Sequence, residues 1–168
     1  AAERDVHRLL ARYTVSELKL YMGELLDYSE RVVRSSLAAL PDGDAEFTEW
    51  NDDDGCGNGP VKIQVKLTKE GDRIKVDYTG TSPQMNGAMH LNYSFTASCT
   101  YAALRAIMPK NTPNNAGFYR PIEIVAPEGC WLNVRYPAAL GARGQGGYRV
   151  RSAMLGALSK LLPDRIPA

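Results

Sequence analysis

Apolar residues recur every three or four positions through the first forty residues, which is the spacing of a helix with one apolar face. Thr14 and Glu17, in "TVSE", have the separation of a capping box, in which each side chain bonds the backbone amide of the other residue. We therefore predict a long amphipathic helix that starts at Thr14 and ends at the "LPDG" turn of residues 40–43. Its apolar positions are Leu18, Tyr21, Met22, Leu25, Leu26, Tyr28, Val32, Val33, Leu37 and Leu40. A shorter helix is expected before it, with an apolar face made of Val6, Leu9, Leu10 and Tyr13.

Apolar and polar residues alternate in two stretches, which begin at residues 61 and 73. "VKIQVKL" (61–67) and "RIKVDYTG" (73–80) alternate on either side of "TKEGD" (68–72), which is the pattern of two strands joined by a turn. We predict a β-hairpin whose lysines face water and whose apolar side chains pack on helices. These apolar side chains are Val61, Ile63, Val65, Leu67, Ile74 and Val76, with Tyr78 as a further candidate.

The rest of the chain adds two helices and one short strand. "NYSFTASCTYAALRAIM" (92–108) and "YRVRSAMLGALSKLLP" (148–163) have helical spacing, and "IEIVAPEG" (122–129) is typical of a buried strand that ends in a turn. "MPKNTPNNAGFYRP" (108–121) is expected to be a structured loop. The predicted fold class is α+β, with long amphipathic helices packed with an antiparallel β-hairpin sheet, in a single domain of residues 1–168.

Charge and composition remove several classes of partner. Lys and Arg number 20 against 19 Asp and Glu, a net charge of +1, so no strong field attracts nucleic acid or an anionic membrane. No apolar run reaches the roughly 18 residues that a membrane-spanning helix needs. Three cysteines at wide spacings suit neither a disulfide framework nor a paired zinc site. We expect no nucleic-acid partner, no membrane, and a cytoplasmic location.

Common catalytic motifs are absent from the sequence. It contains no GxxxxGK[ST] phosphate loop, no HExxH and no GxSxG. Asp52, Asp53 and Asp54 lack the alternating ligand spacing of a calcium loop, which favours a solvated acidic turn over a metal site. His90 is a candidate for direct participation, although a lone histidine is more often structural. Cys99 lies among apolar helix positions and is interpreted as a buried structural thiol.

One stretch, "VDYTGTSPQMNG" (76–87), concentrates hydrogen-bonding groups at the end of the hairpin. It carries a carboxylate, hydroxyls, amides and glycines: Asp77, Thr79, Gly80, Thr81, Ser82, Gln84, Asn86 and Gly87. Such a set can hold a carboxylate, an amide or a carbonyl oxygen. The alternative is a turn that satisfies its own backbone. There are two further polar groups. One consists of Asn114, Asn115 and Arg120, and the other of Arg143, Arg149 and Arg151. Their arginines could clamp a carboxylate or a phosphate, or equally could cap carbonyls or pair with Asp and Glu of an adjacent subunit.

Four motifs, in order, cover nearly the whole chain: "LLDYSERVVRSSLAALPDG", "VDYTGTSPQMNG", "PNNAGFYRPIEIVAPEG" and "YPAALGARGQGGYRVRSAMLGALSKLLPDRIPA". Together they strongly resemble the hydantoinase B/oxoprolinase family. Members of that family are much longer, so the resemblance implies that residues 1–168 are a C-proximal segment of a larger hydantoinase B-type subunit. The apolar faces of the first two predicted helices, which little else in the chain can cover, agree with this interpretation.

The resemblance implies a division of labour. ATP and Mg²⁺ bind to a hydantoinase A-type subunit, which phosphorylates a small carbonyl substrate and so gives an enol or imidate phosphate. The B-type subunit then either hydrolyses a cyclic amide or carboxylates a ketone, and both reactions stay open. We therefore expect a hetero-oligomer. Any divalent metal of carboxylase-type relatives is expected outside this segment, and no residue here is assigned as a metal ligand.

Site residues follow from the matching motifs. The catalytic candidates are Asp77, Gln84 and Arg143, and the substrate-binding candidates are Thr79, Gly80, Thr81, Asn86, His90, Asn115 and Arg120. Asp77 and Gln84 would orient an amide or enol. Arg120 and Arg143 would balance developing negative charge or a phosphate, and the glycines of "GARGQGG" are expected to keep the backbone around Arg143 adaptable.

A second hypothesis comes from another class. The chain would be a noncatalytic assembly domain that supports the active site of the remaining polypeptide or complex. In that case apolar helix positions such as Leu25 and Leu158 would control assembly.

Overall fold

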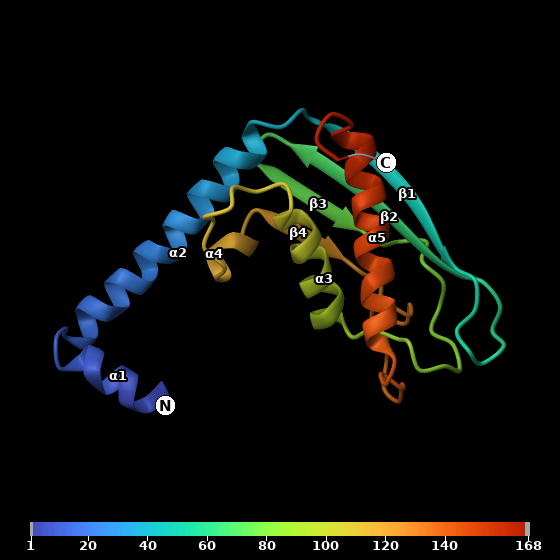
Figure 1. The fold of residues 1–168 in the computed structure, drawn as a ribbon, viewed down its shortest axis with the longest axis horizontal. Coiled ribbons are helices and arrows are strands. Elements are labelled where there is room, and N and C mark those ends of the chain that lie inside the picture. The colour runs from blue at the N-terminus through green and yellow to red at the C-terminus, as the bar shows by residue number, and fades with distance from the viewer. Residues whose placement is uncertain (1, 167–168) are drawn as a thin grey trace.

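The computed structural model of the chain describes residues 2–166 and contains five helices and four strands (Figure 1). In chain order these are α1 (Ala2–Leu10), α2 (Val15–Ala38), β1 (Gly43–Asn51), β2 (Val61–Glu70), β3 (Arg73–Asp77), α3 (Tyr93–Arg105), α4 (Ala116–Tyr119), β4 (Ile122–Val125) and α5 (Arg143–Leu161). The predicted α+β class is confirmed, as are the long helix, the hairpin and the two later helices. None of the helices described is both long and apolar enough to cross a membrane.

A single four-stranded sheet has the order β1-β2-β3-β4. β2 and β3 form the predicted antiparallel hairpin, in which Lys66 lies opposite Asp77. β4 pairs with β3 in parallel, so the sheet is mixed rather than purely antiparallel. The long return from β3 to β4 passes through α3 and α4, since a parallel neighbour requires a crossover connection.

α5 covers one face of the sheet, packing on β1 and β2, and α3 packs beside it (Figure 1). The core between these layers includes Ile63, Val65 and Leu67 of β2 with Met154 and Leu158 of α5, all fully buried. No helix of residues 2–166 lies over the opposite face of the sheet (Figure 1). This second face, here called the outer face, carries the polar residues of the alternating strands.

Strand β1, in "DGDAEFTEW", was not expected from the sequence. Its inward positions include Glu49, whose carboxylate pairs with Arg149 of α5 at 3.0 Å and is only 16% exposed. A charged residue at a core-facing position breaks the apolar alternation by which a strand is recognised. β1 is therefore defined by its nine-residue antiparallel register with β2 rather than by its own pattern.

The expectation that the hairpin lysines face water is wrong for Lys69. Lys62 and Lys66 lie on the outer face, but Lys69 shares the inward face of β2 with Leu67 and is 1% exposed. Its ammonium donates to the carbonyl of Leu40 at 2.5 Å and to Asp42 at 2.6 Å. A buried ammonium needs such partners, because desolvation without them is costly.

α1 and the N-terminal half of α2 extend away from the sheet (Figure 1). The predicted capping box is present, since Thr14 Oγ1 accepts from the amide of Glu17 at 3.2 Å and the Glu17 carboxylate accepts from the amide of Thr14 at 2.7 Å. Only the C-terminal half of α2 contributes buried residues, namely Ser29, Val33 and Leu37. The N-terminal half is thus a helix without a core of its own.

Candidate functional site

The polar run after β3 folds back along β2. Thr81 Oγ1 accepts from the amide of Gln64 at 3.1 Å and donates to its carbonyl at 3.2 Å. Ser82 continues the contact, because its hydroxyl accepts from the amide of Lys62 at 2.9 Å. The part of β2 that β3 no longer covers is therefore paired by residues 81 and 82. Thr81, a substrate-binding candidate, uses its hydroxyl in this structural role.

Asp77 begins a tight turn beside this contact. Its Oδ1 accepts from the amide of Thr79 at 2.8 Å, an Asx turn that fixes the carboxylate. Gly80 follows with a φ of +92°, which an L side chain rarely adopts. A Cβ at Gly80 would also lie 3.4 Å from the Gln64 side chain. Glycine at this position lets the chain turn at the end of the sheet.

A hollow of about 410 Å³ on the outer face brings three predicted residues together, Asp77, Thr79 and Gly80. Its other lining residues come from β1 and β2: Glu46, Lys62, Gln64 and Lys66. The Lys66 ammonium lies 3.7 Å from Glu46 and 3.7 Å from Asp44. No ion pair is found for Lys62 in the part of the chain that the structure describes. The hollow therefore contains two carboxylates, Asp77 and Glu46, and two ammonium groups, of which Lys66 is already ion-paired.

Sequence reasoning missed Lys62 and Lys66. Their signal was present in the hairpin, because alternation puts both lysines on the face opposite Ile63 and Val65. What was lacking was the register, which sets Lys66 directly across from Asp77. Register in a hairpin depends on the turn, and β2 continues three residues further into the expected turn than the alternation indicates.

Gln84 and His90 serve mainly to hold the loop of residues 135–139. The Gln84 amide nitrogen donates to the carbonyls of Arg135 and Pro137 at 3.1 and 3.3 Å, and its oxygen accepts from the amide of Arg135 at 2.8 Å. His90, 1% exposed, accepts at Nε2 from the amide of Met85 and lies 3.0 Å, through Nδ1, from the carbonyl of Ala139. That pairing requires the proton on Nδ1, and it supports the structural alternative for this histidine.

Asn115 and Arg120 lie apart from the Asp77 hollow, where α4 meets α2. Asn115 caps α4 through the amide of Gly117 and donates to the Ser29 hydroxyl at 2.8 Å. Arg120 donates to Asp27 at 2.6 Å and to Glu30 at 2.8 Å. Hydrogen bonds from Arg120, and then from Arg34, hold the pKa of Glu30 below its usual value.

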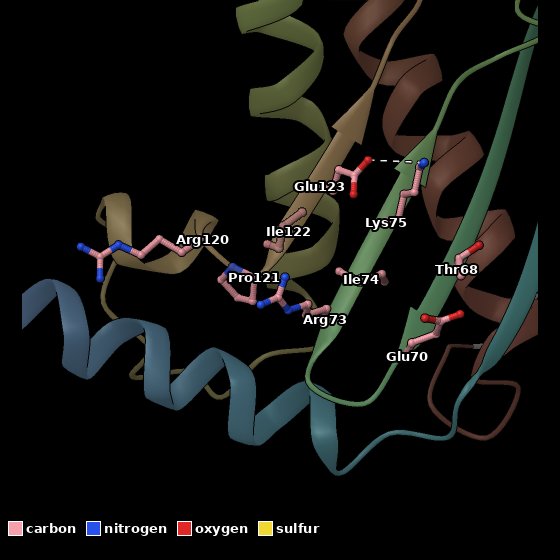
Figure 2. Close-up of a pocket in the computed structure, with 9 residues that line it drawn as sticks. All are labelled: Thr68, Glu70, Arg73, Ile74, Lys75, Arg120, Pro121, Ile122 and Glu123. Carbon is pink, nitrogen blue, oxygen red and sulfur yellow. Dashed lines mark ion pairs between the residues drawn. The ribbon is translucent and has the colours of Figure 1, made fainter.

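Arg120 also borders a second hollow of about 510 Å³, formed by β2, β3 and β4 (Figure 2). Figure 2 shows its guanidinium pointing away from the strand residues. Within this hollow, Lys75 pairs with Glu123 at 3.3 Å. The other two cations of this hollow, Arg73 and Arg120, also have carboxylate partners. Lys62 of the Asp77 hollow has none among residues 2–166, so the Asp77 hollow offers the better arrangement for an anionic ligand.

Arg143 is the first residue of α5 and is exposed. Its guanidinium donates to the carbonyl of Leu140 at 3.3 Å and lies 5.8 Å from the centre of the Phe95 ring. The expected adaptability of the neighbouring glycines is not observed at Gly146 and Gly147, which are buried within the helix. A Cβ on Gly146 would collide with Leu91, the Met89 carbonyl and Trp131.

The remaining candidates, Asn86 and the acidic run of residues 52–54, form hydrogen bonds within and between their loops. The Asn86 carbonyl accepts from the side-chain amide of Asn58 at 3.1 Å, and Asp54 accepts from the amide of Cys56 at 2.9 Å. Burial raises the pKa of the Cys99 and Cys130 thiols, which opposes thiolate chemistry. Among residues 2–166, no group of three or more His, Cys, Asp or Glu side chains is placed to hold a metal ion.

Comparison with known proteins finds relatives that match along nearly the full chain. The family model described as hydantoinase B/oxoprolinase matches residues 1–168. The B-type subunit of a putative D-/L-hydantoinase from Pseudomonas sp. (strain NS671) is 31% identical over 174 residues, covering 95% of this chain and 29% of the relative. This chain therefore spans less than a third of that relative's length.

Two solved structures have the same fold. The ATP-dependent caprolactamase from Pseudomonas jessenii superposes with a TM-score of 0.89 at 27% identity, over 97% of this chain and 28% of that one. An acetone carboxylase, in its nucleotide-free structure, has a TM-score of 0.79 at 15% identity, over 95% of this chain and 23% of that one. The second likeness is one of fold alone. With a family match over its whole length, the chain belongs to the hydantoinase B/oxoprolinase family.

Proposed function

We propose that this chain is a segment of an ATP-dependent enzyme that hydrolyses a cyclic amide. The observation that carries the proposal is the family match over residues 1–168. The relatives of known name above 25% identity include a hydantoinase subunit and a caprolactamase, whose names refer to cyclic amides. The acetone carboxylase likeness, at 15% identity, supports the fold only, so ketone carboxylation is the second candidate.

Amide resonance makes the carbonyl carbon of a lactam a poor electrophile. ATP and Mg²⁺, on a hydantoinase A-type partner subunit of a hetero-oligomer, would phosphorylate the carbonyl oxygen with release of ADP. The carbon of the resulting imidate phosphate is a better electrophile for the water that attacks before the ring C–N bond breaks. This division agrees with the lack of a GxxxxGK[ST] loop in the present sequence. An ATP-dependent reaction and reduced cysteines also fit the cytoplasm, which we propose as the compartment.

The Asp77 hollow supplies groups suited to the second half of such a reaction. Lys62 and Lys66 would attract a carboxylate or a phosphate, and the second carboxylate oxygen of Asp77 would accept a proton from the attacking water. Thr79 and Gly80 would contact the substrate at the same turn. Arg143 would act from the start of α5.

The other candidates take supporting roles within the proposal. Gln84 and His90 would position the loop of residues 135–139, and Thr81 and Asn86 would fix the polar run. Asn115 and Arg120 would act through the junction of α4 with α2.

Turnover of the complete complex tests the reaction. The full-length protein and its A-type partner would be assayed with hydantoin, 5-oxoproline and caprolactam, and separately with acetone and acetophenone plus bicarbonate. The expected result is ATP-dependent ring opening of at least one cyclic amide. Carboxylation of a ketone without ring opening would replace hydrolysis by the second candidate.

Substitution tests the site. Asp77→Asn keeps the size of the side chain but removes its charge, and we expect kcat/KM to fall by about 100-fold, as for loss of a catalytic acid or base. The matched control is Glu123→Gln, on the same outer face but outside this hollow. Wild-type turnover in Asp77→Asn and in alanine variants of Gln84 and Arg143 would contradict the site assignment.

That outcome would favour a noncatalytic assembly domain. One observation supports this alternative, namely that Gln84, His90 and Thr81 all bond to backbone groups. Of the two positions expected to control assembly, Leu25 is 51% exposed and is suited to that role. Leu158 is fully buried against the sheet, so its substitution would test the stability of the fold instead.

A further inference from the structure

Exposed apolar side chains are concentrated in one part of the molecule. Fourteen large hydrophobic residues are exposed, and nine of them lie between Val6 and Tyr28. These nine are Val6, Leu9, Leu10, Val15, Leu20, Tyr21, Met22, Leu25 and Tyr28. Exposed hydrophobic residues scattered singly are ordinary, but a cluster of this kind marks an interaction surface.

Most apolar side chains in the N-terminal half of α2 lie on one side of the helix. At about 100° of rotation per residue, Leu18, Tyr21, Met22, Leu25 and Tyr28 fall within a sector about 120° wide, here called the arm face. Leu20 lies on the other side of the helix, about 160° from Met22. The exposed fractions of Met22 and Leu20 are similar, 66% and 60%. One helix therefore offers a test position and a control position of similar exposure.

The same side of α2 continues into the core of this chain. One turn beyond Leu25 comes Ser29, which is fully buried and hydrogen-bonded by Asn115. Val33 and Leu37 follow, and both are fully buried. α4 closes over α2 at this point, since a Cβ on Gly117 would collide with the Leu26 carbonyl. The arm face is thus the uncovered continuation of a hydrophobic surface whose other half is already core.

A second copy of the chain fits the arm face poorly. The central row of the arm face, which consists of the half-buried Leu18 and the exposed Met22 and Leu25, spans a single heptad. A coiled coil is sustained over about three to four heptads. Beyond Leu25 the row passes into the core at Ser29. A paired helix from another copy would have contact over about two turns only.

The length of the relatives indicates that further polypeptide is available to pack on the arm face. The caprolactamase chain matches 97% of the present chain, so the match includes most of α1 and α2, yet this match spans only 28% of that chain. The helices keep a similar course in a polypeptide that has much more chain available to pack against them. Because the arm face is continuous with the core, we expect the polypeptide that covers it to fold together with this segment.

We propose that the arm face is buried by the remaining polypeptide of a longer hydantoinase B-type protein, through an apolar surface of that same chain. The arm would join this segment to the rest of the polypeptide as a continuous core. This proposal concerns how the protein is built and does not depend on which reaction it performs.

Thiol labelling of the full-length protein, expressed without its partner, tests the proposal. Met22→Cys and Leu20→Cys variants would be labelled with a small maleimide, and the rate at each site read from the peptide by mass spectrometry. We expect Met22→Cys to react at least about tenfold more slowly than Leu20→Cys. Addition of the A-type partner should leave both rates unchanged.

Three outcomes would overturn the proposal. Equal rates at the two sites in the folded protein would show that the arm face is uncovered. Slow labelling of Met22→Cys only after addition of the partner would assign the surface to the partner instead. Slow labelling that depends on protein concentration would assign it to a second copy.

Hydroxyl-radical footprinting of the unsubstituted full-length protein gives the same comparison without a variant. Met22, Tyr21 and Tyr28 should be oxidised slowly, although each is at least 49% exposed in the segment alone. Tyr136, which is 98% exposed on a loop far from α2 in sequence, serves as the accessible reference. Oxidation of the three arm residues as fast as expected from this exposure would contradict the proposal.

Discussion

Tyr78 shows how a single buried side chain links the polar run to the helical layer. It is fully buried at the end of β3, and its hydroxyl lies 2.7 Å from Thr100 Oγ1 of α3. Thr100 donates its own proton to the carbonyl of Thr96 at 2.8 Å, so Tyr78 is the donor in the shared bond. Burial raises the pKa of Tyr78 above its ordinary value of 10.0, because the phenolate would lose its hydration.

Removal of this hydroxyl by Tyr78→Phe should lower the free energy of unfolding by about 1 kcal/mol at neutral pH, the net value of one hydrogen bond. A raised pKa in the folded state stabilises the fold fully below the unfolded pKa, near 10, and this contribution is lost as the pH rises above that value. The decline of stability above pH 10 should therefore be shallower in Tyr78→Phe. Urea unfolding between pH 7 and pH 11 measures both effects.

Tyr136→Phe is the matched control, since the Tyr136 ring is 98% exposed. It should reproduce the parent curve at every pH. An alkaline decline in Tyr78→Phe as steep as in the parent would assign the transition to other groups.

At the scale of elements, small residues decide how closely α5 approaches its neighbours. Gly146 and Gly147 face the loop before α3 and α3 itself, where a Cβ would meet Leu91 or Phe95. Gly156, further along α5, lies against the Phe47 ring of β1. Glycine weakens an isolated helix, so close packing compensates for this lost propensity.

Gly146→Ala should lower the free energy of unfolding by about 1–3 kcal/mol, the usual cost of overpacking a filled core. Gly144→Ala, two residues earlier in the same helix, meets nothing within 4 Å. That control should leave stability unchanged or raise it by up to about 1 kcal/mol through helix propensity. Urea midpoints of the two variants, measured side by side, check the prediction, and an equal shift in both would contradict it.

At the scale of the whole molecule, α2 is attached to the body through its C-terminal half. Arg120, which follows α4, donates hydrogen bonds to the carboxylates of Asp27 and Glu30 in α2. The Glu30 carboxylate also forms an ion pair with Arg34 at 2.7 Å. Arg34 reaches in turn to Asp72 in the β2–β3 turn at 3.1 Å. These ion pairs orient the helix that carries the arm face.

Arg120→Gln should lower the urea midpoint more than Arg73→Gln, because the Arg73 side chain is 74% exposed and its Nε lies 3.9 Å from Asp72. The pKa of Glu30 is lowered in the folded state, so its contribution is present above the ordinary value of 4.5 and is lost as the pH falls below it. The difference between Arg120→Gln and the parent should therefore shrink between pH 6 and pH 3. A difference that stays constant over this range would exclude the carboxylates as its source.

The local sequence determined the elements whose signals are local. The capping box at Thr14 and Glu17, the apolar spacing of α2 and the alternation of the hairpin each depend on neighbours a few residues away, and each prediction is confirmed. Four ordered motifs were enough to indicate the family, and the match over residues 1–168 confirms it.

Tertiary structure decided the features that depend on partners distant in the chain. β1 is a strand because β2 pairs with it and because Arg149 forms an ion pair with the inward-facing Glu49. Lys69 is buried because the Leu40 carbonyl and the Asp42 carboxylate accept hydrogen bonds from its ammonium. The register that sets Lys66 opposite Asp77, with Lys62 in the same hollow, also comes from pairing. Periodicity in the sequence records which face a residue takes, but the identity of its neighbours across a sheet or between helices is fixed only when the layers pack.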